Sequence, residues 1–177
     1  MGGMRFVNIL DQFKLSERSF TSSDIQKIFG LANETVLTYW RNENLLIPSV
    51  SDARGRGKRR IYNFEDVIVA GIIHFLLRHG FSHKNIRELI SITRRKLPEI
   101  MKKVPVPYLV LVLQIGYIRP GDDLSADCII IDQKDLKEIW DEFGHLRLED
   151  SEPELQVQGH IICHFFPIVS KILAYLS

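Results

Sequence analysis

The stretch Arg54-Gly55-Arg56-Gly57-Lys58-Arg59-Arg60-Ile61-Tyr62 decides the fold of the first half of this chain. Five of its nine residues are cationic, and two glycines lie between them. Ile61-Tyr62 is β-prone and Leu45–Pro48 reads as extended, so residues 46–62 are predicted to form a two-stranded hairpin with a long basic tip. A flexible cationic tip suits contact with phosphate groups, and a solvated charged loop is the alternative.

Two short helices are predicted before this hairpin. In the first, Thr21 and Ser22 supply a hydroxyl cap and Asp24 an acid in the first turn, and Gly30 ends the helix. The second covers roughly residues 34–44 and is capped by Asn33. The apolar positions at helical spacing are Ile25, Ile28 and Phe29 in the first helix and Val36, Leu37 and Trp40 in the second.

The opposite face of the second predicted helix is polar. It carries two hydroxyls, a phenol and an amide, which can bond phosphates and the edges of bases. A solvated helix surface explains the same pattern equally well. The residues are Thr35, Thr38, Tyr39 and Asn42.

Two further helices are predicted after the hairpin. Asn63 caps the third, with Glu65 and Asp66 at its positive end, and Gly80 stops it. Residues 67–77 are nearly all apolar, so this helix should be buried on most sides. Ser82 caps the fourth helix, which is expected to reach about residue 97.

In this order, the elements resemble the DNA-binding domain of the MerR family of bacterial transcription regulators. No single piece is specific, and the ordered set covers about residues 20–97. The matching pieces are Phe20-Thr21, Gly30-Leu31, Leu37-Thr38-Tyr39-Trp40, Leu45-Leu46-Ile47-Pro48, Arg60-Ile61-Tyr62, Glu65-Asp66-Val67, Gly80-Phe81-Ser82 and Ile86-Arg87-Glu88-Leu89-Ile90.

The resemblance implies a homodimer that places the second helix of each subunit in a major groove and braces a wing on the flanking backbone. It also implies that DNA shape contributes to specificity. The implied contacts are Thr38, Tyr39 and Arg41 near the helix, and Arg60 and Tyr62 at the wing base. With the polar face and the basic tip, the candidate DNA-binding residues are Thr35, Thr38, Tyr39, Arg41, Asn42, Arg54, Arg56, Lys58, Arg59, Arg60 and Tyr62.

The chain departs from the family pattern in three places. One extra residue lies between Gly30 and Tyr39, and Thr38 stands where many members have arginine. The family's long dimerisation helix is excluded by prolines at positions 98, 105 and 107. A different dimer contact is therefore expected.

Charge divides the chain of 177 residues into two parts. Residues 1–103 carry a net charge of +8 and residues 104–177 one of −7, which favours a nucleic-acid contact in the first part only. The two cysteines, far apart in sequence, form no disulfide framework. With no apolar leader at the start and no apolar run long enough to cross a bilayer, the protein is expected to be cytoplasmic.

The acidic part is predicted to be a small α/β domain. Residues 108–118 and 128–131 are expected to be strands, and a helix capped by Asp132 should run to Gly144. The apolar segment 160–176 is expected to be helical, with Pro167 kinking it or starting a new helix. It should pack on its own domain or on a second subunit.

Three groups of side chains have the residue types of a metal, calcium or proton-sensing site. His160, Cys163 and His164 would share one face of a helix and are metal ligands by type, although buried structural residues explain them better. Asp122, Asp123 and Asp127 lack the glycine and glutamate of a calcium hand. His74 reads as a core residue that could sense protons.

The sequence therefore predicts an α+β protein: an arm over residues 1–19, a MerR-like winged helix-turn-helix domain over 20–103, and an effector or dimerisation domain over 104–177. It should not be an enzyme and should need no cofactor or metal. The expected function is sequence-specific regulation of transcription by a dimer on promoter DNA. The expected partners are double-stranded DNA, a second copy of the chain, RNA polymerase and a small-molecule effector. The alternatives are an excisionase-like architectural protein and a module that grips an acidic protein.

Overall fold

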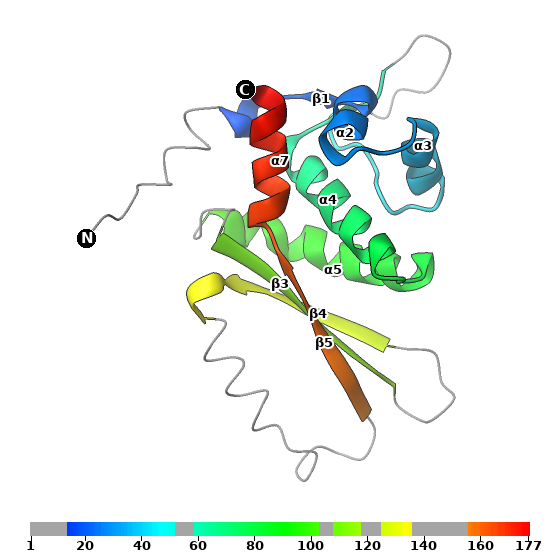
Figure 1. The fold of residues 1–177 in the computed structure, drawn as a ribbon, viewed down its shortest axis with the longest axis vertical. Helices are drawn as coiled ribbons and strands as arrows, with labels where there is room; N and C mark the ends of the chain where they lie inside the picture. Colours follow the sequence, from blue (N-terminus) through cyan, green and yellow to red (C-terminus); the bar gives the residue numbers. More distant parts are fainter. Residues whose placement is uncertain (1–13, 52–58, 103–107, 118–124, 136–155) are drawn as a thin grey trace, which may run out of the picture. The chain divides into compact units, whose positions relative to one another are not determined.

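The computed structural model describes residues 14–51, 59–102, 108–117, 125–135 and 156–177. The chain divides into two compact units, one formed by residues 1–80 with 168–177 and the other by residues 81–167. The predicted domain boundary at 103/104 lies outside the described residues. Taken together, the described elements are mostly helical, with small antiparallel sheets (Figure 1).

Short helices and one two-stranded sheet make up the first unit. The C-terminal helix joins them, from Ile168 onward. Its elements are the 3-10 helix η1 (Leu15–Glu17), β1 (Phe20–Thr21), α2 (Ser22–Phe29), α3 (Thr35–Asn42), β2 (Ile61–Tyr62), α4 (Phe64–Arg78) and α7 (Phe166–Leu176).

Helix α2 begins and ends as its sequence predicts. The Thr21 hydroxyl accepts a hydrogen bond from the Asp24 amide, and the Asp24 carboxylate accepts one from the Thr21 amide. Such a reciprocal capping box satisfies two amides that the helix leaves unbonded. Gly30 ends the helix in the left-handed region, at φ 63°. The buried positions are Ile25, Ile28 and Phe29.

Helix α3 is shorter than the predicted range of 34–44. Glu34 and not the predicted Asn33 is the cap residue of α3. Asn33 still contributes, because its Oδ1 accepts a hydrogen bond of 3.0 Å from the Thr35 amide at the start of the helix. Leu37 and Trp40 are buried and anchor the helix to the core. The chain leaves the helix through Asn44, whose φ is 56°.

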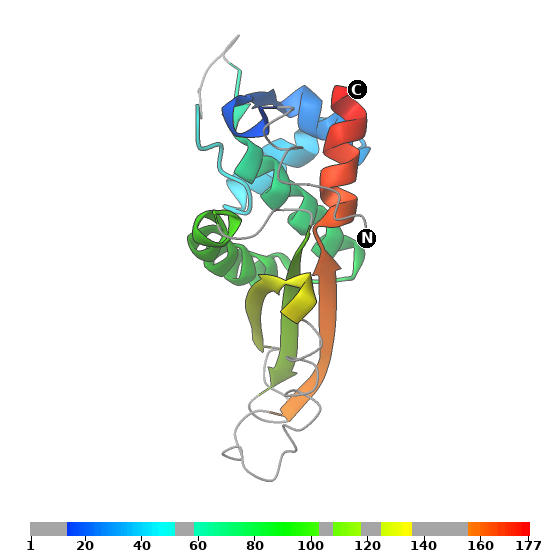
Figure 2. The same cartoon turned by 90° about the vertical axis from the view of Figure 1, so that its left-hand side faces the viewer.

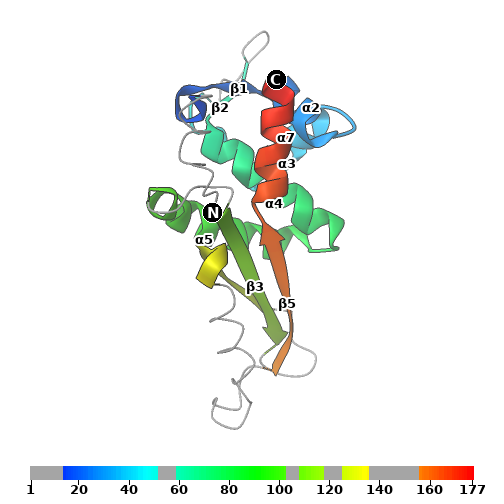
Figure 3. The same cartoon turned by 60° about the vertical axis from the view of Figure 1, so that its left-hand side comes forward.

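The predicted hairpin over residues 46–62 is confirmed only at its base. Ser51 and Ile61 exchange two backbone hydrogen bonds of 3.1 and 2.9 Å, which close the loop between them. The expected strand at 45–48 is wrong, because Leu45, Leu46 and Pro48 turn into the core instead of forming a ladder. Strand β2 pairs with β1, which the sequence did not reveal (Figure 3).

Helix α4 is the central helix of this unit. Asn63 and Asp66 form a second capping box at its start, and Gly80 follows its end at φ 83°. Nearly every position from Phe64 to Ile73 is buried. The predicted cap, the burial and the stop at Gly80 are all confirmed.

The second unit combines helix α5 (His83–Met101) with a three-stranded antiparallel sheet in the order β4-β3-β5 (Figure 2). The strands are β3 (Leu109–Tyr117), β4 (Ser125–Asp132) and β5 (Gln156–His164), and the 3-10 helix η3 (Gln133–Asp135) follows β4. Helix α5 contacts β4. The two predicted strands are confirmed. The helix expected after Asp132 lies mainly in residues 136–155, outside the described residues.

Two expectations about proline and the C-terminus need correction. Pro98 lies inside the last turn of α5 instead of ending the helix, which continues to Met101. Residues 160–176 are not one helix: they form the end of β5 and then α7. Pro167 is the second residue of α7, where a missing amide costs little.

Candidate nucleic-acid interface

The polar face of α3 lies on the surface, as predicted. Tyr39 is 45% exposed, Thr35 and Asn42 are exposed, and Thr38 is half-buried. Arg41 is also half-buried, on the last turn of the helix. Because buried Leu37 and Trp40 fix the rotation of the helix, its polar side chains hold a constant direction.

One hydrogen bond joins this helix to the base of the wing. Arg60 Nη1 donates to Thr38 Oγ1 at 2.9 Å, across 22 residues of sequence. Arg59, beside it, is exposed. The structure therefore brings a cationic strand end and the polar helix face together into one surface.

Asp66 fixes the other arm of the wing, a role that the sequence did not reveal. Its carboxylate is 1% exposed and accepts hydrogen bonds from the Ser49 amide at 2.8 Å and the Ser49 hydroxyl at 2.6 Å. Asn63 donates its amide to the same oxygen at 3.2 Å. The loop before the wing is thus tied to the start of α4, with Ile47 and Val50 exposed on it.

The helix pair α2 and α3 and the paired residues Ser51 and Ile61 lie within the part of the chain that matches a known family. Residues 20–92 match the model of the MerR HTH family of regulatory proteins. These residues form a MerR-type helix-turn-helix domain. The MerR domain is a regulatory domain and not an enzymatic one.

Curated proteins similar to this chain come from mycobacteria. One uncharacterised HTH-type transcriptional regulator of Mycobacterium bovis and two of Mycobacterium tuberculosis are each 38% identical to this chain over 60 residues. The match covers 34% of this chain and 27% of each relative. The likeness therefore covers about a third of this chain and about a quarter of each relative.

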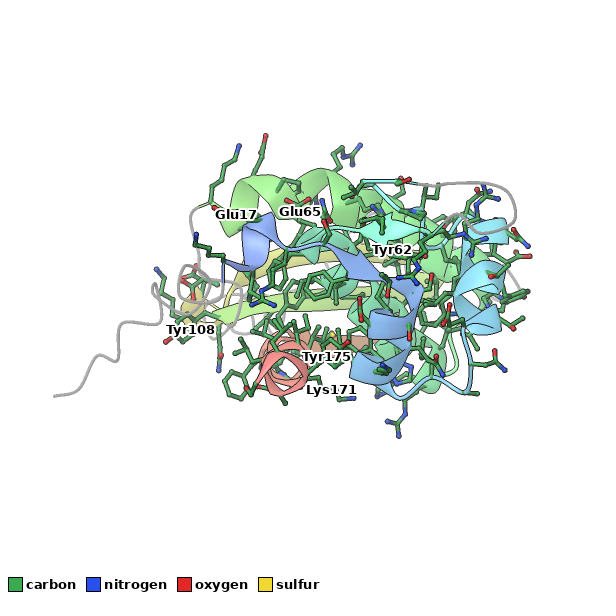
Figure 4. All side chains as sticks on the ribbon, turned by 90° about the horizontal axis from the view of Figure 1, so that it is seen from above. Glu17, Tyr62, Glu65, Tyr108, Lys171 and Tyr175 are labelled. Atoms are coloured by element: carbon green, nitrogen blue, oxygen red, sulfur yellow. The ribbon has the colours of Figure 1, made fainter. Side chains whose placement is uncertain are left out.

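One predicted contact of the MerR domain must be corrected. The Tyr62 side chain is 0% exposed, so it packs in the core and is not presented to a ligand (Figure 4). Tyr62 pairs with Phe20, which is also buried, and alternate residues of a strand point to opposite faces. Arg54, Arg56 and Lys58 lie outside the described residues.

His74 of the MerR domain lies half-buried on α4, its ring centroid 6.2 Å from that of Phe29. Burial lowers the pKa of His74, and the positive charges of Lys171 and Arg78 lower it further. The neutral imidazole is therefore the form that suits this site.

Beyond the MerR domain, the single helix face on which His160, Cys163 and His164 would lie together does not form, because these residues belong to β5. Cys163 and His164 are neighbours on a strand, so they point to opposite sides: Cys163 is buried and His164 is exposed. Burial raises the pKa of Cys163 to about 12, which keeps the thiol protonated. Within the described residues, no three His, Cys, Asp or Glu side chains gather as a metal site. None of the helices described combines the length and apolar character needed to cross a bilayer.

Proposed function

We propose that this protein is a transcriptional regulator that binds duplex DNA as a dimer through its MerR domain. In this proposal α3 enters the major groove, and the wing contacts the phosphate backbone beside it. The observation that carries it is the bond from Arg60 to Thr38, because that bond holds a cation and the polar helix face on one surface. The mycobacterial relatives, which are described as HTH-type transcriptional regulators, support it.

The roles of the surface residues follow from their exposure. Exposed Tyr39, Thr35 and Asn42 are assigned to base edges, and exposed Arg59 is assigned to a phosphate. Arg54, Arg56 and Lys58 are assigned to phosphates from their charge in the sequence alone. Arg41 lies on the last turn of α3, and Arg60 lies beside the helix. Phosphate contacts supply affinity that depends on salt, and base contacts supply sequence preference. RNA polymerase and a small-molecule effector stay predictions from the family resemblance.

The test begins with selection of bound duplexes from a random-sequence library. Binding of the selected duplex is then measured against salt for the wild type and for the joint variant Arg56→Ala, Lys58→Ala, Arg59→Ala and Arg60→Ala. If each cation contacts one phosphate, the slope of log affinity against log salt should flatten by about 3.6 for each bound subunit. Tyr39→Ala should instead reduce the preference for the selected sequence.

A charge-matched control removes four exposed cations from α5 and its C-cap: Lys84, Arg87, Arg95 and Lys102. The control should change the slope by less than about 1, because counterion release counts only neutralised phosphates. Equal slopes for the two variants would show that the wing makes no special contact. Equal affinity for the duplex and for an acidic polypeptide would favour the module that grips an acidic protein.

A further inference from the structure

The C-terminal helix is part of the same compact unit as the MerR-type helices, although residues 81–167 separate it from them. Ile168, Val169 and Ile172 of α7 are buried. Figures 1 and 3 both draw α7 beside α2 and α4. The helix thus completes the unit that carries the proposed DNA-binding surface.

Gly71 of α4 makes room for this helix. A Cβ atom at position 71 would lie 2.6 Å from Cγ2 of Ile168 and 3.1 Å from its Cγ1 and Cδ1. Carbon atoms pack at about 3.5–4.0 Å, so an alanine would push Ile168 away. Glycine inside a helix costs about 1 kcal/mol relative to alanine, and close contact between α4 and α7 explains its presence in this otherwise apolar helix.

Near the other end of α7, Tyr175 bonds to the capping box of α2. Its hydroxyl donates to Asp24 Oδ1 at 2.6 Å, while Asp24 Oδ2 accepts from the Thr21 amide at 2.7 Å and hydroxyl at 2.8 Å. Figure 4 shows Tyr175 on α7 facing α2. Burial raises the pKa of Asp24, but the bonds from Tyr175 and Thr21 and the charge of Lys27 outweigh it, so the pKa is lowered and the carboxylate stays ionised.

These contacts continue to the wing. Thr21 pairs with Ile61 across β1 and β2, and Ile61 follows Arg60, whose guanidinium bonds to Thr38 on α3. The steps are hydrogen bonds at Asp24 and Thr38, the pairing of β1 with β2, and the peptide bond between Arg60 and Ile61, all between described residues. The end of α7 is therefore connected, through the start of α2, to the side chain that joins the wing to the polar helix face.

We propose that α7 positions the DNA-binding surface, with Gly71 and Ile168 forming its seat and Tyr175 acting as a positioning residue for the wing base. This inference rests on the proposed function.

The seat is tested with Gly71→Ala, Ile168→Ala and the double variant in the full-length protein. Gly71→Ala should release α7, and an isolated helix of this length is marginal in water, so trypsin should cut after the exposed Lys171. Affinity for the selected duplex should fall about tenfold. Adding Ile168→Ala should restore both readouts toward those of Ile168→Ala alone, because the new methyl group occupies the space vacated by Ile168.

The bond to Asp24 is tested with a milder change that keeps the ring. Tyr175→Phe should weaken DNA binding about two- to threefold while the thermal midpoint stays nearly unchanged, because one partly exposed hydrogen bond contributes little to folding. Tyr108→Phe removes a hydroxyl from a similarly exposed tyrosine in the second unit and should leave DNA binding unchanged.

The possible results separate the two proposals. Wild-type protein that binds no duplex overturns the proposed function before any variant is compared. If the wild type binds and Gly71→Ala is cleaved faster after Lys171 but keeps its DNA affinity, the positioning role of α7 is overturned. An unchanged cleavage pattern in Gly71→Ala overturns the seat, and equal DNA affinities for Tyr175→Phe and Tyr108→Phe overturn the role of Tyr175.

Discussion

The start of α2 and the start of α4 carry the same local motif and use it differently. Each has a polar cap residue and an aspartate three positions later, paired in a reciprocal capping box. Asp66 lies in the interior and accepts hydrogen bonds from Ser49, which is 17 residues away in sequence. Asp24 is half-buried and accepts a hydrogen bond from Tyr175, which is 151 residues away. The capping box determines where each helix begins. The acceptor positions that remain on its aspartate carboxylate determine which distant segment is hydrogen-bonded to the start of that helix.

The largest effect is expected from Asp66→Ala. It leaves the amides of Ser49 and Asn63 without their carboxylate acceptor in a buried site, which should lower the free energy of unfolding by about 2–4 kcal/mol. Urea unfolding followed by circular dichroism measures it. Glu65→Ala, in the same helical turn, is the matched control and should cost far less. Equal losses would mean that the bonds to Ser49 contribute nothing beyond helix charge.

A smaller effect is expected from Asp24→Ala, which removes the same kind of cap at a partly exposed position. The loss should be about 1 kcal/mol, the usual value for a capping residue. The same urea experiment compares it directly with Asp66→Ala. If the two variants lose equal stability, burial does not distinguish the two helix starts.

The smallest effect concerns the other ends of these helices, where Phe29 of α2 meets His74 of α4. The pKa of His74 is lowered in the folded protein, so the unfolded chain binds a proton more readily. The contribution of neutral His74 to folding stability is present above the pKa of about 6.5 that histidine has in the unfolded chain. It is lost as the pH falls below this value toward the lower pKa of His74 in the folded protein. Urea midpoints between neutral and mildly acidic pH should therefore fall less in His74→Gln than in the wild type.

Exposed His164 provides the control for this pH dependence. His164→Gln should retain the wild-type slope of stability against pH. If His164→Gln flattened the slope as much as His74→Gln did, the pH dependence could not be assigned to the contact between α2 and α4.

Much of the MerR domain was predictable because its determinants are local. The caps at Thr21, Asn63 and Ser82 act within three residues, and Gly30 and Gly80 end helices through their own backbone angles. The exposed face of α3 follows from the burial of its opposite face. Sequence spacing alone is sufficient for each of these features.

The errors arose where distant segments decide the outcome. Tyr62 is buried because β2 pairs with β1, and no local pattern reveals that partner. The apolar residues at 160–165 fit a helix or a strand equally well, and pairing with β3 makes them a strand. Asp66 was predicted only to suit the helix dipole, because its partner Ser49 lies in another segment. Residues Arg54, Arg56 and Lys58 stay predictions.

Residues 81–167 leave the first unit after α4 and return to it at α7, so they form a loop closed by a folded domain. The entropy of closing such a loop grows only with the logarithm of its length. Evolution can therefore lengthen or shorten the part of this segment that follows residue 92 at small thermodynamic cost, provided that the chain still returns to α7. The same helix-turn-helix unit could in this way carry different inserted segments before α7 without a change in its core.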